Sequence, residues 1–206
     1  MREPLNLSDK QTVAGRPFTD PGHSADDLAV MRHMARQLVD IYDDPVVCDF
    51  HPGKRPICKS DTQKRFFRIY YIQPDLLFTL TNLTVVGFFG QKRPQADIQP
   101  LLDADKKFET TFHDHPGLLS LSTVRLPNGD FANLVLFTDD EAKDKWNFSP
   151  LHAEIVPKVS PPYYRSIRLN NGRLPQGLDA PDALFLERTR YIDYDSDPPW
   201  RALRQQ

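Results

Sequence analysis

The sequence of 206 residues has no long apolar run, no strong net charge and no common catalytic motif, and each absence excludes a class of function. No stretch approaches the roughly 20 apolar residues that span a bilayer, and residues 1–18 lack the apolar segment of a secretory signal. We therefore expect a cytoplasmic location and no membrane partner. The formal net charge of −2 gives no overall field that would recruit nucleic acid. Phosphate-binding loops, nucleophile elbows and zinc-protease motifs are also missing.

Cysteine is scarce as well, since Cys48 and Cys58 are the only two and His51 lies between them. Three interpretations stay open: free structural thiols, a disulfide that closes a small loop, or a metal site. The free thiols are favoured, because three ligands at this spacing match no standard zinc pattern. His113 and His115 flank an aspartate at a predicted helix end, which favours a cap and turn over chelation. We predict no bound metal.

Glycine is also sparse, with 9 residues against 19 prolines, and the hydrophobic fraction of 39% is low. This composition is typical of a folded core with stiff connections, because globular domains usually reach roughly 45–50%. Residues 1–24 are polar and predict a flexible N-terminal arm. We expect a helix-plus-strand extension over residues 25–82, a core over 83–178 and a C-terminal arm over 179–206.

The N-terminal extension contains one clear helical pattern. Apolar residues recur at spacings of three and four over residues 28–41, with Ser24 as the expected N-cap and Pro45 beyond the end. The segments 65–72 and 76–90 are rich in β-branched and aromatic residues, which predicts strands.

The core has a regular order of elements from Leu83 to Leu174. Strand, helix, strand, strand, helix and strand follow one another, and Asn128-Gly129 marks a hairpin between the second and third strands. This order indicates an α+β protein with a ferredoxin-like β-α-β-β-α-β core, in which both helices lie on one face of an antiparallel sheet.

Residues 83–174 resemble the dimeric α/β-barrel superfamily, and within it the antibiotic-biosynthesis-monooxygenase-like domains. The resemblance rests on four segments in order: "LTVVGFF", "HDHPGLLSLSTVR", "ANLVLFTDDEAKDKWNFSPLH" and "PPYYRSIRL". It implies a homodimer whose two sheets form a shared barrel, and a pocket between each sheet and its helices. Some members of the family oxidise small aromatic substrates without a metal or flavin, so it also implies an apolar or aromatic ligand.

Other members of this family bind and degrade haem, and the resemblance to them is incomplete. Their tryptophan on the second helix matches Trp146, but their iron-binding histidine, ten residues later, is replaced by Val156. Their asparagine on the first strand is replaced within "VVGFF", and Asn82 comes too early. We therefore expect no cofactor, with haem binding or degradation kept as the less favoured alternative.

The catalytic candidates are Trp146 and His152. Ser149 and Pro150 are suited to begin a new helix, which would place His152 in the first turn. There the helix dipole keeps the imidazole neutral, so that it could act as a base. A purely structural histidine at a helix start remains the alternative.

Three further residues are expected to line a ligand pocket: Phe89, Tyr164 and Arg125. A strand arginine that faces a pocket could hold a carboxylate, although an arginine that faces solvent at a sheet edge is the commoner case. The sequence thus predicts a small-molecule-binding homodimer, with cofactor-independent monooxygenase-like activity. The alternative is a non-enzymatic binding or assembly protein that dimerises through its sheet, because no complete catalytic set is present.

Overall fold

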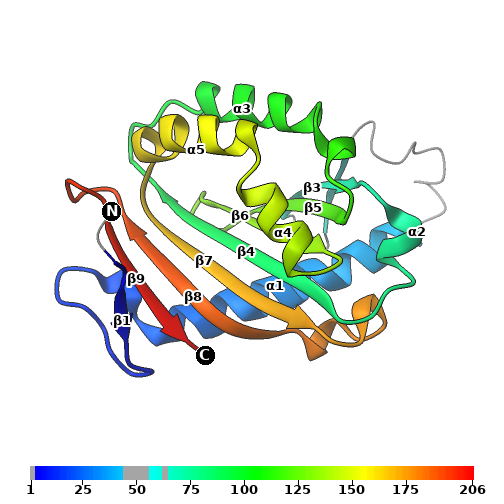
Figure 1. Cartoon of the computed structure of the whole chain (residues 1–206), viewed down its shortest axis with the longest axis horizontal. Coiled ribbons are helices and arrows are strands. Elements are labelled where there is room, and N and C mark those ends of the chain that lie inside the picture. The colour runs from blue at the N-terminus through cyan, green and yellow to red at the C-terminus, as the bar shows by residue number, and fades with distance from the viewer. Residues whose placement is uncertain (1–2, 44–55, 62–64) are drawn as a thin grey trace.

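The computed structural model describes residues 3–43, 56–61 and 65–206. The nine strands of these residues form one sheet in the order β1-β9-β8-β7-β4-β6-β5-β3-β2 (Figure 1). Every neighbouring pair is antiparallel except β1 with β9. The strands are β1 (Leu5–Leu7), β2 (Ile57–Ser60), β3 (Phe66–Tyr71), β4 (Leu83–Lys92), β5 (Leu118–Arg125), β6 (Phe131–Phe137), β7 (Tyr164–Leu174), β8 (Phe185–Asp193) and β9 (Trp200–Gln205). The α-helices are α1 (Pro21–Tyr42), α2 (Pro74–Leu77), α3 (Gln99–Glu109), α4 (Asp140–Asn147) and α5 (Pro150–Tyr163).

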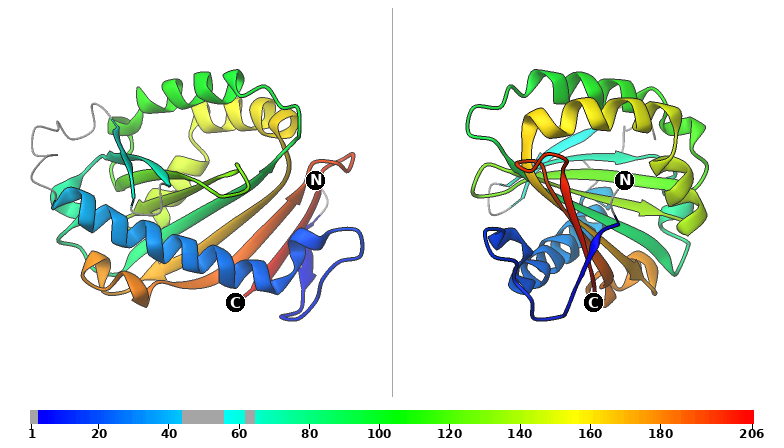
Figure 2. Two further views of the ribbon diagram at one scale, coloured as in Figure 1. Left: turned by 180° about the vertical axis from the view of Figure 1, so that it is seen from behind. Right: turned by 60° about the vertical axis from the view of Figure 1, so that its left-hand side comes forward.

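The sheet has a helix layer on each face. Helix α1 crosses one face, whereas α3, α4 and α5 lie on the other (Figures 1 and 2). The apolar stripe of α1, with Met31, Met34 and Leu38, is buried against side chains of the central strands such as Val85 and Leu134. This packing gives the sheet its main hydrophobic core.

The position of helix α1 also limits how the predicted homodimer could form. Because α1 fills one face of the central strands, a second sheet cannot pack there while α1 is in place. The outermost described strands, β1 and β2, are the places where the sheet could still be extended. The homodimer itself stays a prediction.

The predicted order of elements in the core is confirmed, as β4, α3, β5, β6, the α4–α5 pair and β7 follow one another. The hairpin between β5 and β6 is confirmed too, with Gly129 at φ 84° in the turn. Helix α5 begins as predicted: Pro150 is its first residue, and the Ser149 hydroxyl accepts a hydrogen bond from the His152 amide at 3.3 Å. The local sequence signals of this region were therefore sufficient to predict the order of its elements and the start of α5.

The predictions for the two ends of the chain are wrong. Leu5–Leu7 form β1 and pair with β9, and α1 already begins at Pro21. Its N-cap is Asp20, whose carboxylate accepts from the Gly22 amide at 2.8 Å, whereas Ser24 lies buried inside the helix. Proline is favoured at the first helical position, so the Asp-Pro pair starts the helix earlier than the serine would.

The presumed C-terminal arm is part of the sheet as well, because β8 and β9 are its seventh and eighth strands from the β2 end. One strand prediction also needs correction: within segment 76–90 the strand starts only at Leu83. Pro74 opens the one-turn helix α2 ahead of it, in agreement with the preference of proline for a first helical turn.

Three sequence predictions concern metal, thiols and membranes. Cys48 and His51 lie outside the described residues, and Cys58 is a free, exposed thiol on β2. The described residues contain no group of three or more His, Cys, Asp or Glu side chains arranged to hold a metal ion. Across the same residues, none of the helices has the length and apolar character needed to cross a membrane.

Candidate functional site

A cavity of about 210 Å³ lies between α3 and the sheet face that β3, β5 and β6 form. We call it the α3 groove. Half of its lining is apolar and half is polar. The apolar residues are Phe66, Ile98, Leu101, Leu102, Leu121 and Phe131, and the polar ones are Arg68, Asp105, Thr123, Arg125, Asn133 and Tyr164.

The periods of the secondary structure bring these side chains together. Ile98, Leu102 and Asp105 follow at spacings of four and three along the start and body of α3, so they share one helical face. Thr123 and Arg125 alternate along β5 and therefore point to the same side of the sheet. The groove is thus one face of a helix set over one face of a hairpin.

The polar side chains of the groove differ in how far they are paired. Arg68 of β3 binds Asp105 of α3 at 2.6 Å and links the two walls. Arg125 is exposed and has no ion-pair or hydrogen-bond partner in the described part of the chain. Thr123 Oγ1 and Asn133 Oδ1 are shielded from solvent and lack a hydrogen-bond partner among the described residues. Arg125 is directly accessible to a ligand, whereas the two shielded oxygens would need a side-chain rotation to reach one.

Tyr164 closes the groove at the start of β7. Its ring is buried and packs edge-on against Phe88, with 5.2 Å between the ring centroids. Gly90 makes room for it, because a Cβ there would collide with the Tyr164 ring. Burial raises the pKa of the Tyr164 hydroxyl, so it stays protonated at neutral pH and can donate a hydrogen bond.

The two catalytic candidates are brought together, but outside the groove. Trp146 on α4 is buried, and its ring centroid lies 6.0 Å from that of His152 and 4.8 Å from that of His115. Phe108 of α3 contacts both Trp146 and His152, one helical turn beyond Asp105. The pair therefore adjoins the groove without lining it, and its catalytic role stays a prediction.

The surroundings of His152 keep it neutral. Burial lowers the pKa of the imidazole, a hydrogen bond to the Asn147 backbone opposes that shift, and nearby His115 adds to it. A neutral imidazole can accept a proton, as a general base must. The same contacts would also suit a structural histidine that anchors the start of α5.

Phe89 lies on the opposite face of the sheet. It faces α1 and lines a separate cavity of about 490 Å³, where the Arg168 guanidinium lies 5.8 Å from its ring centroid. Because alternate residues of a strand point to opposite sides, Phe88 faces the helices that cover the groove instead. Of the three predicted pocket residues, Arg125 and Tyr164 lie in the α3 groove and Phe89 does not.

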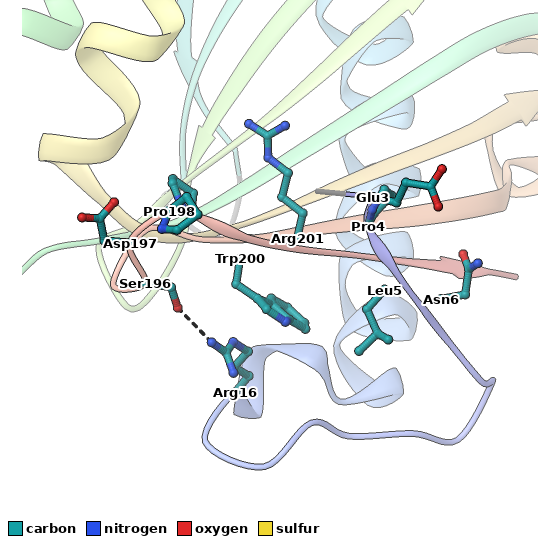
Figure 3. A pocket seen from close by; sticks show the side chains of 11 residues that line it. Glu3, Pro4, Leu5, Asn6, Arg16, Ser196, Asp197, Pro198, Trp200 and Arg201 are labelled. Atoms are coloured by element: carbon teal, nitrogen blue, oxygen red, sulfur yellow. Dashed lines mark hydrogen bonds between the residues drawn. The ribbon is translucent and has the colours of Figure 1, made fainter. Parts of the chain in front are cut away.

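A larger cavity of about 810 Å³ lies where β1 and the start of β9 meet the turn before β9 (Figure 3). Trp200 and Arg16 form its most distinctive wall, with 4.4 Å between the guanidinium carbon and the ring centroid. Arg16 is already paired, because it donates to Ser196 at 2.8 Å and lies 2.9 Å from Asp193. Its one shielded polar atom without a hydrogen-bond partner among the described residues, Arg16 Nε, is held by the ion pair with Asp193, so we place the candidate site in the α3 groove, which has two such atoms.

Sequence reasoning missed Arg68, Asp105, Thr123 and Asn133. A signal was present in the predicted hairpin, since its Asn-Gly turn sets the register that pairs Thr123 with Asn133. No such signal existed for Arg68 and Asp105, which meet only through tertiary packing.

The residues present do not fit haem. Val156 occupies the position of the expected iron ligand, and the His152 ring is engaged with Asn147 and Trp146. The groove of about 210 Å³ is also below the roughly 300–1,000 Å³ of pockets for drug-sized ligands. We therefore derive no haem chemistry for this chain.

Neither a family model nor a curated protein matches the sequence. Three solved structures are similar in part. A candidate monooxygenase from Lactobacillus acidophilus is 15% identical, with a TM-score of 0.40 over 52% of this chain and 50% of that chain. A heme-degrading enzyme from Listeria monocytogenes is 16% identical, with a TM-score of 0.36 over 61% of this chain and 80% of that chain. A monooxygenase-like protein from Listeria innocua is 16% identical, with a TM-score of 0.31 over 61% and 76%.

The chain thus spans about half the length of the first of these structures. Similarity at this level does not identify a reaction, so we argue function from the groove.

Proposed function

We propose that the chain binds a small, mostly apolar or aromatic molecule in the α3 groove. The observation that carries this proposal is the combination of an apolar wall with solvent-shielded polar groups, at Thr123 and Asn133, that the protein itself leaves unpaired. Unpaired buried polar groups cost free energy, and a ligand that pairs them recovers it. Concave, largely apolar sites with a few placed polar groups are the usual form of ligand pockets.

The size of the groove limits the ligand. Its volume of about 210 Å³ suits a single-ring compound. Leu102, at the mouth of the groove, is 36% exposed, so a ligand can cover part of its side chain. Covering apolar surface contributes about 25 cal/mol of binding free energy per Å².

Ligand-induced thermal stabilisation tests the proposal. A single-ring ligand at about 100 times its Kd adds about 2.7 kcal/mol of stability, which raises the Tm by about 5–10 °C for a chain of this length. Leu102→Lys places a charged chain at the mouth and should abolish the shift. Leu76→Lys is the matched control, because Leu76 on α2 is 41% exposed and does not line the groove. An equal shift in both variants, or no shift with any single-ring compound, contradicts the proposal.

We further propose that turnover, where it occurs, is monooxygenase-like and independent of metal or flavin. Neutral His152 on α5 adjoins the groove without lining it, so it could take a proton from a bound aromatic substrate only through a water or after a rearrangement around Phe108. Oxygen uptake with phenolic compounds should then depend on His152, and His152→Gln should slow it by at least tenfold while ligand binding is kept. Uptake that is unchanged in His152→Gln refutes the catalytic role.

The second candidate is an assembly protein that dimerises through its sheet. It is favoured by the edge strand β1, where Leu5 is an exposed apolar side chain beside unpaired backbone groups. Light scattering after size exclusion distinguishes the two states, because the monomer has a mass of 23.7 kDa and a homodimer twice that. A monomeric mass over the whole concentration range excludes this candidate.

A further inference from the structure

The α3 groove carries one uncompensated positive charge. Three ionisable groups with charges at neutral pH line it: Arg68, Asp105 and Arg125. The first two bind each other at 2.6 Å, so their charges cancel locally. Arg125 remains, and within the described residues no acidic side chain pairs with it. A neutral apolar ligand would leave that charge unused, whereas a monoanion would match it.

We propose that the ligand of this groove is a small aromatic or apolar monoanion, in particular a carboxylate, and that Arg125 selects it. The inference rests on the proposed binding function and adds the chemical class of the ligand. A guanidinium presents parallel N–H donors that match the two oxygens of a carboxylate.

The neighbours of Arg125 extend this anion site. Thr123 lies two residues earlier on β5, so both side chains leave the same face roughly 6.6 Å apart. Asn133 lies opposite Thr123 in the register of β5 and β6, and Phe131 lies opposite Arg125. A threonine hydroxyl can donate to a carboxylate oxygen, whereas the unpaired Asn133 Oδ1 only accepts, so Asn133 would have to turn its amide NH2 group toward the ligand. The unused polar groups and the unused charge therefore occupy one corner of the groove.

The opposite wall suits the body of such a ligand. Leu101 and Leu102 of α3, with Ile98 at its N-cap, form an apolar surface across the groove from this corner. The Asp105 carboxylate, which could repel an anion, is neutralised by Arg68. The arrangement thus separates an apolar wall from a cationic corner, as recognition of an aromatic acid requires.

Three probes of the same size and shape test the charge preference: benzoate, benzamide and benzamidine, with charges of −1, 0 and +1 at pH 7.5. Calorimetry with the full chain should give the order benzoate, benzamide, benzamidine, from tightest to weakest. Arg125→Ala should weaken benzoate about tenfold, the lower limit for a hydrogen bond to a charged group, because Arg125 is partly hydrated. Benzamide should change less than about threefold.

Two further variants act as controls. Arg188→Ala removes the same charge from β8, four strand spacings or roughly 19 Å from β5, and should leave all three affinities unchanged. Thr123→Val removes a hydroxyl that has no partner in the free protein, so it should weaken benzoate without lowering the Tm. Raising the salt concentration should weaken benzoate more than benzamide, since ionic contacts near the surface are screened.

The outcomes separate this inference from the binding function itself. If all three probes bind equally well and Leu102→Lys abolishes their binding, the groove is a ligand site but the anion preference is wrong. If Arg125→Ala weakens benzamide as much as benzoate, Arg125 does not select by charge and the inference is also wrong. If none of the probes binds, both proposals are overturned.

Discussion

Asp27 of α1 anchors this helix to the sheet, and its removal should be among the most destabilising single changes. Its buried carboxylate accepts two hydrogen bonds from Arg168 at 2.7 Å and one from Asn170 at 2.8 Å. Asp27→Ala would leave both β7 side chains without their acceptor. Breaking a buried ion pair by removing one partner costs about 3–5 kcal/mol. Because the Arg168 side chain keeps 17% of its exposure, we expect the lower end, about 3 kcal/mol.

Urea unfolding followed by tryptophan fluorescence measures this loss. A cost of about 3 kcal/mol is a fifth or more of the 5–15 kcal/mol that stabilises a typical domain, so the midpoint should fall at unchanged m-value. Asp26→Ala is the control, because Asp26 is an exposed neighbour on the same helix and should change stability by less than about 0.5 kcal/mol. The double variant Asp27→Leu with Arg168→Met should be more stable than Asp27→Ala, since no charge is left unpaired. A loss below about 1 kcal/mol in Asp27→Ala would refute the anchoring role.

Three further changes probe other parts of the structure. Burial lowers the pKa of both His152 and His115, so the unfolded chain binds protons more readily and the free energy of unfolding should fall as the pH drops below about 6.5; His152→Gln should flatten this pH dependence in urea titrations at pH 5.5 and 7.5, and an unchanged slope would contradict it. Gly172→Ala should cost more than about 2 kcal/mol in urea unfolding, because its Cβ would collide with the backbone carbonyl oxygen of Phe185 on the neighbouring strand; a urea midpoint equal to that of the parent chain would contradict this clash. Ser149→Ala should cost about 1 kcal/mol in the same assay through loss of the N-cap of α5, and no change would mean that Pro150 alone starts the helix.

The elements that could be predicted are those fixed by interactions within a few residues. The buried stripe of α1 follows from its spacing of three and four, and the turn between β5 and β6 follows from Asn128-Gly129. The restart of the helix at Ser149 also follows from two adjacent residues. Each of these signals acts locally, so it does not depend on which element packs nearby.

The ends of the sheet were missed because their strands are covered less evenly than the central ones. On β8, Leu186 and Tyr191 are buried, whereas Glu187 and Arg190 are exposed, and the mean composition of such a strand resembles that of a polar tail. The distinction lies in its order, since a strand alternates and a disordered tail has no period. The bulge opposite Asn171 interrupts even that alternation.

The position of the groove could not be derived from the sequence for a different reason. Strand β4 is buried on both faces, so alternation separates Phe88 from Phe89 but gives no polar side to show which of them faces α1. Arg125 was predicted as a pocket residue because it is a strand cation, and Tyr164 because it is a strand aromatic; both lie in the α3 groove, and their role in binding stays a prediction. Their common cavity exists only because α3 crosses above β5 and β6, and that placement is set by the packing of Phe108 against α4 and α5. A ligand site between two layers can therefore be located only when the positions of both layers are known. Each lining residue, in contrast, can be predicted from the strand or helix to which it belongs.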